Sequence, residues 1–260
     1  MNERSERTIM TDSVLIDTVD GVLTITWNEP DRLNALTADM LNAAAAAIED
    51  ASPDTRLVVI TGNGRAFSSG AALGADFDGS ATLDGANRLV RAMTRSPLPV
   101  ISAVNGIAAG VGCSIAIAAD ITLAKSSGYF LLAFVNIGLM PDGGATELVA
   151  ASVGRARANR MAMLGEKLPA DEAAAIGLIY KSLGDDDYDA ELAILVGTIG
   201  SGPTKALSAM KKVITANTLP RLDEALDAEL EGQVALFSTK DAFEGGSAFL
   251  EKRPAAFTGA

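Results

Sequence analysis

The chain of 260 residues contains no histidine. Ser-His-Asp and Cys-His nucleophilic sites, histidine general bases and histidine-rich metal sites are therefore excluded. These are the commonest devices of hydrolases and metalloenzymes. Any catalysis must come from carboxylates, lysine, tyrosine, serine or backbone dipoles, and we predict no metal site.

Cysteine, net positive charge and long apolar runs are missing as well. A single cysteine, Cys113, excludes an internal disulfide and suits a reducing compartment, so we expect a cytoplasmic location. The 21 basic residues are outnumbered by 33 acidic ones, and the formal net charge of −12 argues against a nucleic-acid partner. The apolar run over residues 107–119 is short, interrupted by glycine and ends at Asp120, which predicts no membrane-spanning segment.

Enough apolar material is present for one sizeable core. Hydrophobic residues make up 48% of the chain, and charge is spread along it, which is typical of a folded domain. Residues 1–12 are mostly polar and charged, and we expect a disordered tail there. No repeat or linker divides the rest, so we distinguish by pattern a core over residues 13–200 and a helical region over residues 201–260.

Local patterns predict an α/β fold. Strands are expected at residues 14–18, 22–27, 57–61 and 100–104. Asp20 and Gly21 form a two-residue turn signal that favours a hairpin between the first two strands. Residues 68–84, rich in Gly, Ser, Ala and Asp, are predicted to form a loop. Helices are expected at residues 38–51, 145–151, 155–164, 170–176, 203–216, 222–237 and 241–251.

Two glycine-rich segments each follow a predicted strand. One covers residues 62–71 and the other residues 106–114, where the glycines precede an alanine-rich helix. Backbone amides at such positions can point at an anion, and one amide from each segment would form an oxyanion hole. Glycines of this kind can also serve only the close packing of a helix on a sheet. Taken alone, the two segments leave both interpretations open.

A series of longer motifs carries a resemblance to a known family. The motifs are NEPDRLNAL at residues 28–36, GNGRAFSSGAAL at 62–73, PVISAVNG at 99–106, FVNIGLMPDGGAT at 134–146, the segment 170–178 and AFLEKR at 248–253. In order and spacing they resemble the signatures of the enoyl-CoA hydratase/isomerase (crotonase) superfamily. The resemblance extends from about residue 14 to residue 257.

This resemblance implies a crotonase (ClpP/crotonase-like) α/β fold, a spiral of β-β-α units with a C-terminal helical region that mediates trimers. We therefore expect a homotrimer or a dimer of trimers. The implied substrate is an acyl-CoA thioester, so coenzyme A belongs to the substrate and no separate cofactor is expected. By the same resemblance, the amides of Ala71 and Val111 form the oxyanion hole for the thioester carbonyl. Val111 stands where many members have glycine, but only its amide is required.

The resemblance also implies how coenzyme A is held. Relatives grip its head with the segment that corresponds to Asp31, Arg32 and Leu33. A neighbouring subunit often supplies a phosphate contact from the position of Lys252. Relatives commonly have lysine at the position of Asp31, and because an acid is a worse phosphate partner, we expect Arg32 to substitute for it.

The catalytic acids are where the chain departs from the hydratases of this family. Hydratases carry one glutamate directly after the Gly-Cys step and another shortly before the Gly-Leu step, and the corresponding residues here are Ser114 and Phe134. Addition of water needs a group that deprotonates it and a source for the proton delivered to carbon. Neither side chain can act in this way, and we expect both to line the substrate pocket.

Asp142 remains, and it matches the single acid of family isomerases that move a double bond between C3 and C2. One carboxylate suffices, because it can remove a proton from C2 and return it at C4 while the oxyanion hole holds the dienolate. We therefore predict a 3-enoyl-CoA to 2-enoyl-CoA isomerase with Asp142 as base and acid. Two rival interpretations stay open: Asp142 caps the following helix, or Glu147 is the catalytic acid.

Other functions stay open at this point. An enoyl-CoA hydratase is the main alternative, and a non-catalytic acyl-CoA-binding protein is another. Isomerisation of ring-containing or oxepin-type CoA substrates would use the same geometry. Family dehalogenases with an aspartate at the position of Asp142 also depend on a histidine, which this chain lacks.

Overall fold

Two β-sheets form the centre of the fold, and the chain alternates between them. In the computed structural model, which describes residues 9–74 and 77–260, the larger sheet has seven strands in the order β1-β2-β3-β4-β6-β8-β11. The smaller sheet has four strands in the order β10-β9-β7-β5. The strands of the larger sheet are β1 (Ile9–Thr11), β2 (Val14–Val19), β3 (Val22–Trp27), β4 (Leu57–Gly62), β6 (Val100–Val104), β8 (Ile121–Lys125) and β11 (Lys181–Leu183). Those of the smaller sheet are β5 (Ala66–Ser68), β7 (Ile107–Ala109), β9 (Tyr129–Leu131) and β10 (Leu168–Pro169).

A β-β-α step repeats along this framework. Strand β4 lies in the larger sheet, β5 lies in the smaller one, and α2 leads back to β6, after which β6, β7 and α3 repeat the step. Strands β4, β6 and β8 pair in parallel in one sheet, as do β5, β7 and β9 in the other. The predicted α/β spiral of β-β-α units is confirmed.

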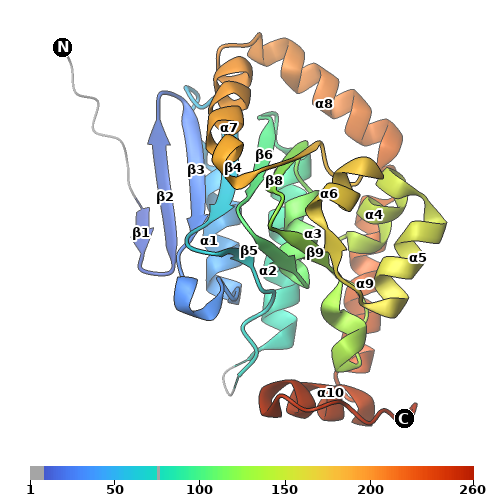
Figure 1. Cartoon of the computed structure of the whole chain (residues 1–260). Helices are drawn as coiled ribbons and strands as arrows, with labels where there is room; N and C mark the ends of the chain where they lie inside the picture. The colour runs from blue at the N-terminus through green and yellow to red at the C-terminus, as the bar shows by residue number, and fades with distance from the viewer. Residues whose placement is uncertain (1–8, 75–76) are drawn as a thin grey trace.

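Helices cover the sheets and extend beyond them. They are α1 (Ala38–Glu49), α2 (Gly79–Arg95), α3 (Val111–Ile117), α4 (Ala145–Val153), α5 (Arg155–Leu164), α6 (Ala170–Ala175), α7 (Asp185–Gly200), α8 (Thr204–Thr218), α9 (Leu222–Leu236) and α10 (Lys240–Glu251), with 3₁₀ turns η1 (Pro30–Arg32) and η2 (Ala133–Ile137). Helices α8 and α10 lie at opposite ends of the molecule (Figure 1). No helix in the described part of the chain has the length and apolar character needed to cross a bilayer.

Two expected regions, the loop over residues 68–84 and the N-terminal tail, are contradicted in part. The loop predicted over residues 68–84 is wrong in its second part, because α2 begins at Gly79 after Asp78, whose side chain accepts a hydrogen bond from the Ala81 amide at 2.9 Å. Of the tail expected over residues 1–12, residues 1–8 lie outside the described residues. Residues 9–11 form β1, which pairs antiparallel with β2, so that part of the expectation is wrong.

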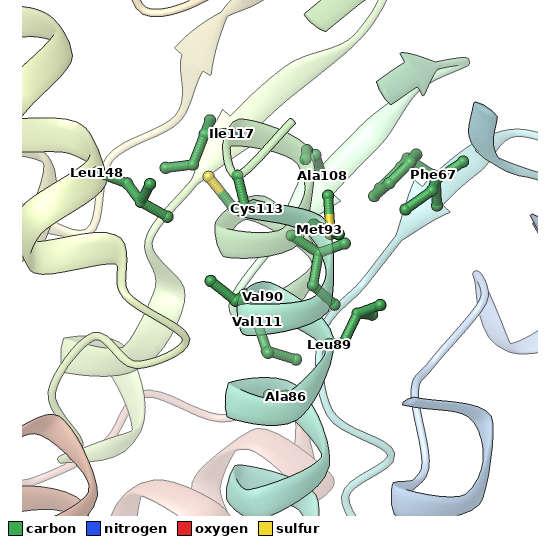
Figure 2. Packing of buried hydrophobic residues seen from close by; sticks show 14 of the residues in the cluster. Phe67, Ala86, Leu89, Val90, Met93, Ala108, Val111, Cys113, Ile117 and Leu148 are labelled. Atoms are coloured by element: carbon green, nitrogen blue, oxygen red, sulfur yellow. The ribbon is translucent and has the colours of Figure 1, made fainter. Parts of the chain in front are cut away.

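The main core lies between the helices and the sheets. Figure 2 shows Met93 of α2 and Cys113 of α3 among the buried side chains that connect the two helices. Cys113 is fully buried, and burial raises the pKa of its thiol to about 12, so it behaves as a small core residue. Leu222 and Leu226 of α9 belong to the same core, so the helices after residue 200 do not form an independent body.

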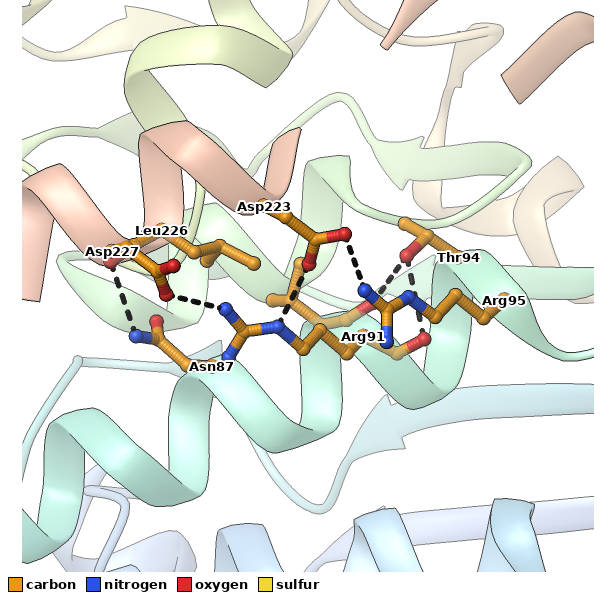
Figure 3. Close-up of polar contacts among 8 residues, drawn as sticks. Asn87, Arg91, Thr94, Arg95, Asp223, Leu226 and Asp227 are labelled. Carbon is orange, nitrogen blue, oxygen red and sulfur yellow. Dashed lines mark hydrogen bonds and ion pairs between the residues drawn. The ribbon is translucent and has the colours of Figure 1, made fainter. Parts of the chain in front are cut away.

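Charged contacts attach α9 to α2. Arg91 donates to Asp223 at 2.9 Å and to Asp227 at 2.8 Å, and Arg95 also pairs with Asp223 (Figure 3). These pairs are largely exposed, so each contributes little energy by itself. Together with the buried Leu226 they fix which face of α9 is directed at the core, and that face carries part of the site described below.

Several apolar side chains remain exposed on the outer helices. They include Ile194, Met210, Val213, Ile214, Val234, Phe243, Phe249 and Leu250. A subunit interface would cover side chains of this kind. Assembly into a homotrimer or a dimer of trimers stays a prediction.

Candidate active site

A cavity of about 640 Å³ lies where the loop before α1, the segment before α2 and the helices α9 and α10 meet. Its walls are mainly apolar, with Leu33, Leu73, Leu83, Phe134, Leu139 and Phe237 among the lining side chains. Among the described residues, the acids that line it are Asp31, which is exposed, and Asp142, which is 7% exposed. The size and lining suit a small apolar ligand with a few polar contacts.

The 28–36 motif forms the wall that carries Arg32 and Leu33. Asn34 is fully buried, and its side-chain amide donates to the Asn63 carbonyl at 2.9 Å and to the Ala66 carbonyl at 2.7 Å. Its side-chain oxygen accepts from the Glu29 amide at 2.9 Å. Asn34 therefore fastens this loop to the first glycine-rich segment and holds both wall residues at the cavity.

The two glycine-rich segments meet beside the cavity. Gly70 has a φ of +103° and Gly110 a φ of +53°, values that favour glycine. A Cβ on Gly70 would lie 3.1 Å from the Ala109 carbonyl oxygen and 3.5 Å from Gly110 Cα. Both glycines therefore serve a close approach of one segment to the other.

The amides of Ala71 and Val111 follow these two glycines, and both residues line the cavity. Leu36 and Ala71 form an isolated parallel β-bridge: the Leu36 amide donates to the Gly70 carbonyl, and the Ala72 amide donates to the Leu36 carbonyl. In this pattern the amide of Ala71 itself points away from Leu36. Val111 is the first residue of α3, where an amide has no partner within the helix. Neither amide donates to another backbone group among the described residues, so both are without a backbone partner at the cavity.

Asp142 presents one carboxyl oxygen without a protein partner. Its Oδ2 accepts from Gln233 Nε2 at 2.9 Å, while its buried Oδ1 has no hydrogen-bond partner among the described residues. Burial raises the pKa of Asp142 to about 7; the Gln233 hydrogen bond opposes this rise and the charge of Glu229 adds to it. Near neutral pH such a group can both take and give a proton.

Helix capping does not explain Asp142. The residue before α4 is Gly144, and the Ala145 amide donates to the backbone carbonyl of Asp142, not to its side chain. The side chain that bonds amides here is Glu229, which accepts from Gly144 N at 2.6 Å and from Thr146 N at 2.9 Å. The capping interpretation of Asp142 is therefore wrong. The rival acid, Glu147, is half-buried and does not line the cavity.

Glu229 and Gln233 were not predicted from the sequence. They are 2% and 1% exposed, on the face of α9 that also buries Leu222 and Leu226. A polar residue at a core position of an amphipathic helix needs a partner, and this pattern was the available signal. It indicates burial, but it does not indicate which loop these side chains support.

Of the two residues expected to line the substrate pocket, Phe134 does so and Ser114 does not. Phe134 is 6% exposed and lines the cavity, as expected. Ser114 is fully buried behind the wall, and its hydroxyl donates to the backbone carbonyl of Asp142 at 2.7 Å. The expectation that Ser114 lines the pocket is therefore corrected: it supports the loop that carries Asp142.

Only some of the residues expected to hold coenzyme A line the cavity. Arg32 and Leu33 line the cavity, whereas Lys252 is exposed at the end of α10 and lies outside the lining. The neighbouring Arg253 lines the cavity instead, paired with Glu244 and Glu251. The single chain therefore places an arginine, and not Lys252, at its own cavity.

Comparison with known proteins places these features in a family. The model of the enoyl-CoA hydratase/isomerase family matches residues 17–260. A probable enoyl-CoA hydratase of Rhodobacter capsulatus is 42% identical over 92% of this chain and 95% of its own. The 1,2-epoxyphenylacetyl-CoA isomerase of Escherichia coli is 36% identical over 96% of this chain and 100% of its own.

A solved structure agrees with the sequence comparisons. The crystal structure of an enoyl-CoA hydratase from Mycobacterium avium subsp. paratuberculosis superposes with a TM-score of 0.92 at 44% identity, covering 96% of this chain and 100% of that one. With the spiral fold and the cavity described above, these matches show that the chain belongs to the enoyl-CoA hydratase/isomerase family.

Proposed function

We propose that the protein is an acyl-CoA isomerase that converts a 3-enoyl-CoA to a 2-enoyl-CoA. One observation carries this proposal: Asp142 is the buried acid among the described cavity residues, and one of its oxygens lacks a protein partner. At the two glutamate positions of family hydratases the chain has Ser114 and Phe134. The site therefore has the means for proton transfer and lacks a pair of acids for handling water.

The proposed reaction uses Asp142 twice. As a carboxylate it removes a proton from C2, which the thioester acidifies, and the electron pair passes into a dienolate. The amides of Ala71 and Val111 stabilise the negative charge on the thioester oxygen. The protonated Asp142 then returns the proton at C4, which leaves the double bond between C2 and C3 and regenerates the carboxylate.

Two other activities are supported by relatives. The hydratase names of two similar proteins favour hydration, but the exposed Asp31 is a poor substitute for a second buried acid. The Escherichia coli relative is named for the isomerisation of an epoxide CoA ester. That substrate would need the same oxyanion contacts and a single acid, so a ring-containing substrate is the second candidate.

Purified protein is expected to isomerise 3-enoyl-CoA much faster than it hydrates 2-enoyl-CoA. The measurement is the initial rate with each substrate under identical conditions, followed by chromatography of the products. Efficient hydration of 2-enoyl-CoA by the wild type would refute the proposal. Binding of acyl-CoA without turnover of either substrate would identify a non-catalytic binding protein.

Lys252 tests the assembly-dependent part of coenzyme A binding. Since Lys252 lies outside the cavity of its own chain, we propose that it contacts a phosphate of coenzyme A held by a neighbouring subunit. Lys252→Ala should then weaken coenzyme A binding by about 1–3 kcal/mol at low salt, as for one charge-assisted hydrogen bond. Isothermal titration calorimetry measures this, with Lys240→Ala, an exposed lysine at the other end of α10, as the control. An unchanged dissociation constant would show that Lys252 makes no such contact.

A further inference from the structure

Two hydrogen bonds to the loop that carries Asp142 fix the orientation of the Gln233 side-chain amide. Its Oε1 accepts from the Met140 amide at 3.2 Å, and its Nε2 donates to Asp142 Oδ2 at 2.9 Å. A backbone amide can only donate, so the oxygen of Gln233 must face Met140 and its NH₂ group must face Asp142. Since Gln233 is 1% exposed, water does not compete for either contact.

This orientation makes the two oxygens of Asp142 unequal. Oδ2 receives a hydrogen bond whether or not the acid is protonated, so a proton placed there would face the NH₂ group of Gln233. Oδ1 has no partner among the described residues. We propose, on the basis of the isomerase function above, that Gln233 is a positioning residue that confines the transferred proton to Oδ1 of Asp142.

The consequence is that one oxygen carries out both proton transfers. The C2–H bond breaks, its electron pair enters the dienolate, and an O–H bond forms at Oδ1. That O–H bond then breaks as the C4–H bond forms, and the carboxylate returns to its starting state. Because the proton stays on a buried oxygen on one face of the substrate, a deuterium taken from C2 should reappear at C4 with little exchange into water.

The charged surroundings of Asp142 make this inference testable by pH. Among the described residues, Glu229 of α9 is the charged group that acts on Asp142, and it raises the pKa. The Ser114 hydroxyl of α3, which is uncharged, bonds to the backbone of Asp142, and the wall of the same cavity carries the uncharged Phe134 of η2 and Leu83 and Ala86 of α2. Glu147 of α4 lies outside the cavity, and the remaining charged lining residues are exposed: Asp31, Arg32, Arg65 and Arg253.

Two variants of α9 should therefore shift the activity profile in opposite directions. In the wild type, kcat/KM should rise with pH through about 7, as Asp142 ionises. Gln233→Met keeps the shape of the side chain but removes the hydrogen-bond donor that favours the carboxylate. The rise in kcat/KM should therefore shift to higher pH by about one unit. Glu229→Gln removes the neighbouring negative charge, so the rise in kcat/KM should shift to lower pH. Glu231→Gln, an exposed acid on the same helix, is the matched control and should not move it.

Two further measurements separate this role from simple structural support. With 3-enoyl-CoA deuterated at C2, Gln233→Met should lower the fraction of label found at C4, because both oxygens can then hold the proton. Infrared titration of the Asp142 carboxyl, identified by its absence in Asp142→Asn, should show the same opposite shifts without substrate. If Gln233→Met changed neither the pH dependence of kcat/KM nor the fraction of label found at C4, the inference would be wrong. If the infrared shifts appear but the wild type isomerises nothing, the proposed function fails while the hydrogen-bonding role of Gln233 stands.

Discussion

Replacement of Asp142 by asparagine is expected to lower the isomerisation rate by about 10²–10⁴-fold, the usual scale for general acid–base catalysis. The asparagine oxygen can still accept the hydrogen bond from Gln233, so the loop should keep its conformation. The group that faces the substrate would then be an NH₂ group, which can act neither as a base nor as an acid near neutral pH. Steady-state rates with 3-enoyl-CoA measure the loss, and the transfer of deuterium from C2 to C4 should disappear with it.

The same variant should gain stability at alkaline pH. The native pKa of Asp142 is raised to about 7, above its unfolded value of about 3.9, so the native state holds this proton more tightly. The resulting stabilisation is complete below the unfolded pKa and is lost as pH rises through about 7. Urea unfolding at pH 8 should therefore show Asp142→Asn to be more stable than the wild type, with a smaller difference at pH 5.

The control for the activity measurement on Asp142→Asn is Glu147→Gln. Glu147 lies outside the cavity, so its amide variant should keep full activity. If Asp142→Asn remained fully active while Glu147→Gln lost its activity, the assignment of the acid would pass to Glu147. A loss of activity in Asp142→Asn that came with lost coenzyme A binding would indicate a damaged fold and contradict the catalytic assignment.

Lys211→Ala is expected to lower the free energy of unfolding by about 3 kcal/mol, the lower end of the range for breaking a buried ion pair. Lys211 Nζ lies 2.8 Å from Asp120 Oδ2 and also donates to the carbonyls of Met93 at 2.6 Å and Leu98 at 2.8 Å. The lysine side chain is 5% exposed. Alanine would leave two carbonyls and a carboxylate without their cation. Because the Asp120 side chain is 27% exposed, water can compensate part of this loss.

Urea unfolding followed by circular dichroism measures the effect of Lys211→Ala. Lys212→Ala is the matched control, because Lys212 is the exposed next residue on α8 and its loss should change the stability by less than about 0.5 kcal/mol. Equal unfolding midpoints for the two variants would show that the buried contact does not hold α8 in place.

The sequence was informative where local pattern and family motif agree. Residues 22–27 were expected as a strand and form β3, and Asp142 lies in the cavity wall. Helix α2 was missed: residues 79–84, which have weak local preferences, were assigned to a loop, and no helix was predicted over residues 85–95. This helix is stabilised by the burial of Leu83, Leu89 and Met93, a tertiary contribution that local propensity does not contain.

The supporting residues of the site could not be predicted for a different reason. Gln233 and Asp142 are far apart in the sequence, as are Lys211 and Asp120. A buried polar residue indicates that some partner exists, but the partner is determined by how α9 and α8 dock on the core. The short strands of the smaller sheet were missed similarly, because their pairing depends on neighbouring turns of the spiral.

The close packing behind Asp142 restricts which side chains position 114 can carry. A Cβ at Gly143 would already lie 3.0 Å from Ser114 Cβ, and the Ser114 hydroxyl is bonded to the backbone of the same loop. A glutamate at position 114 would need space that the loop of Asp142 now fills. Ser114→Glu alone would therefore displace the loop that carries Asp142. A glutamate at position 114 is thus expected to be tolerated only together with a compensating change in the Asp142 loop.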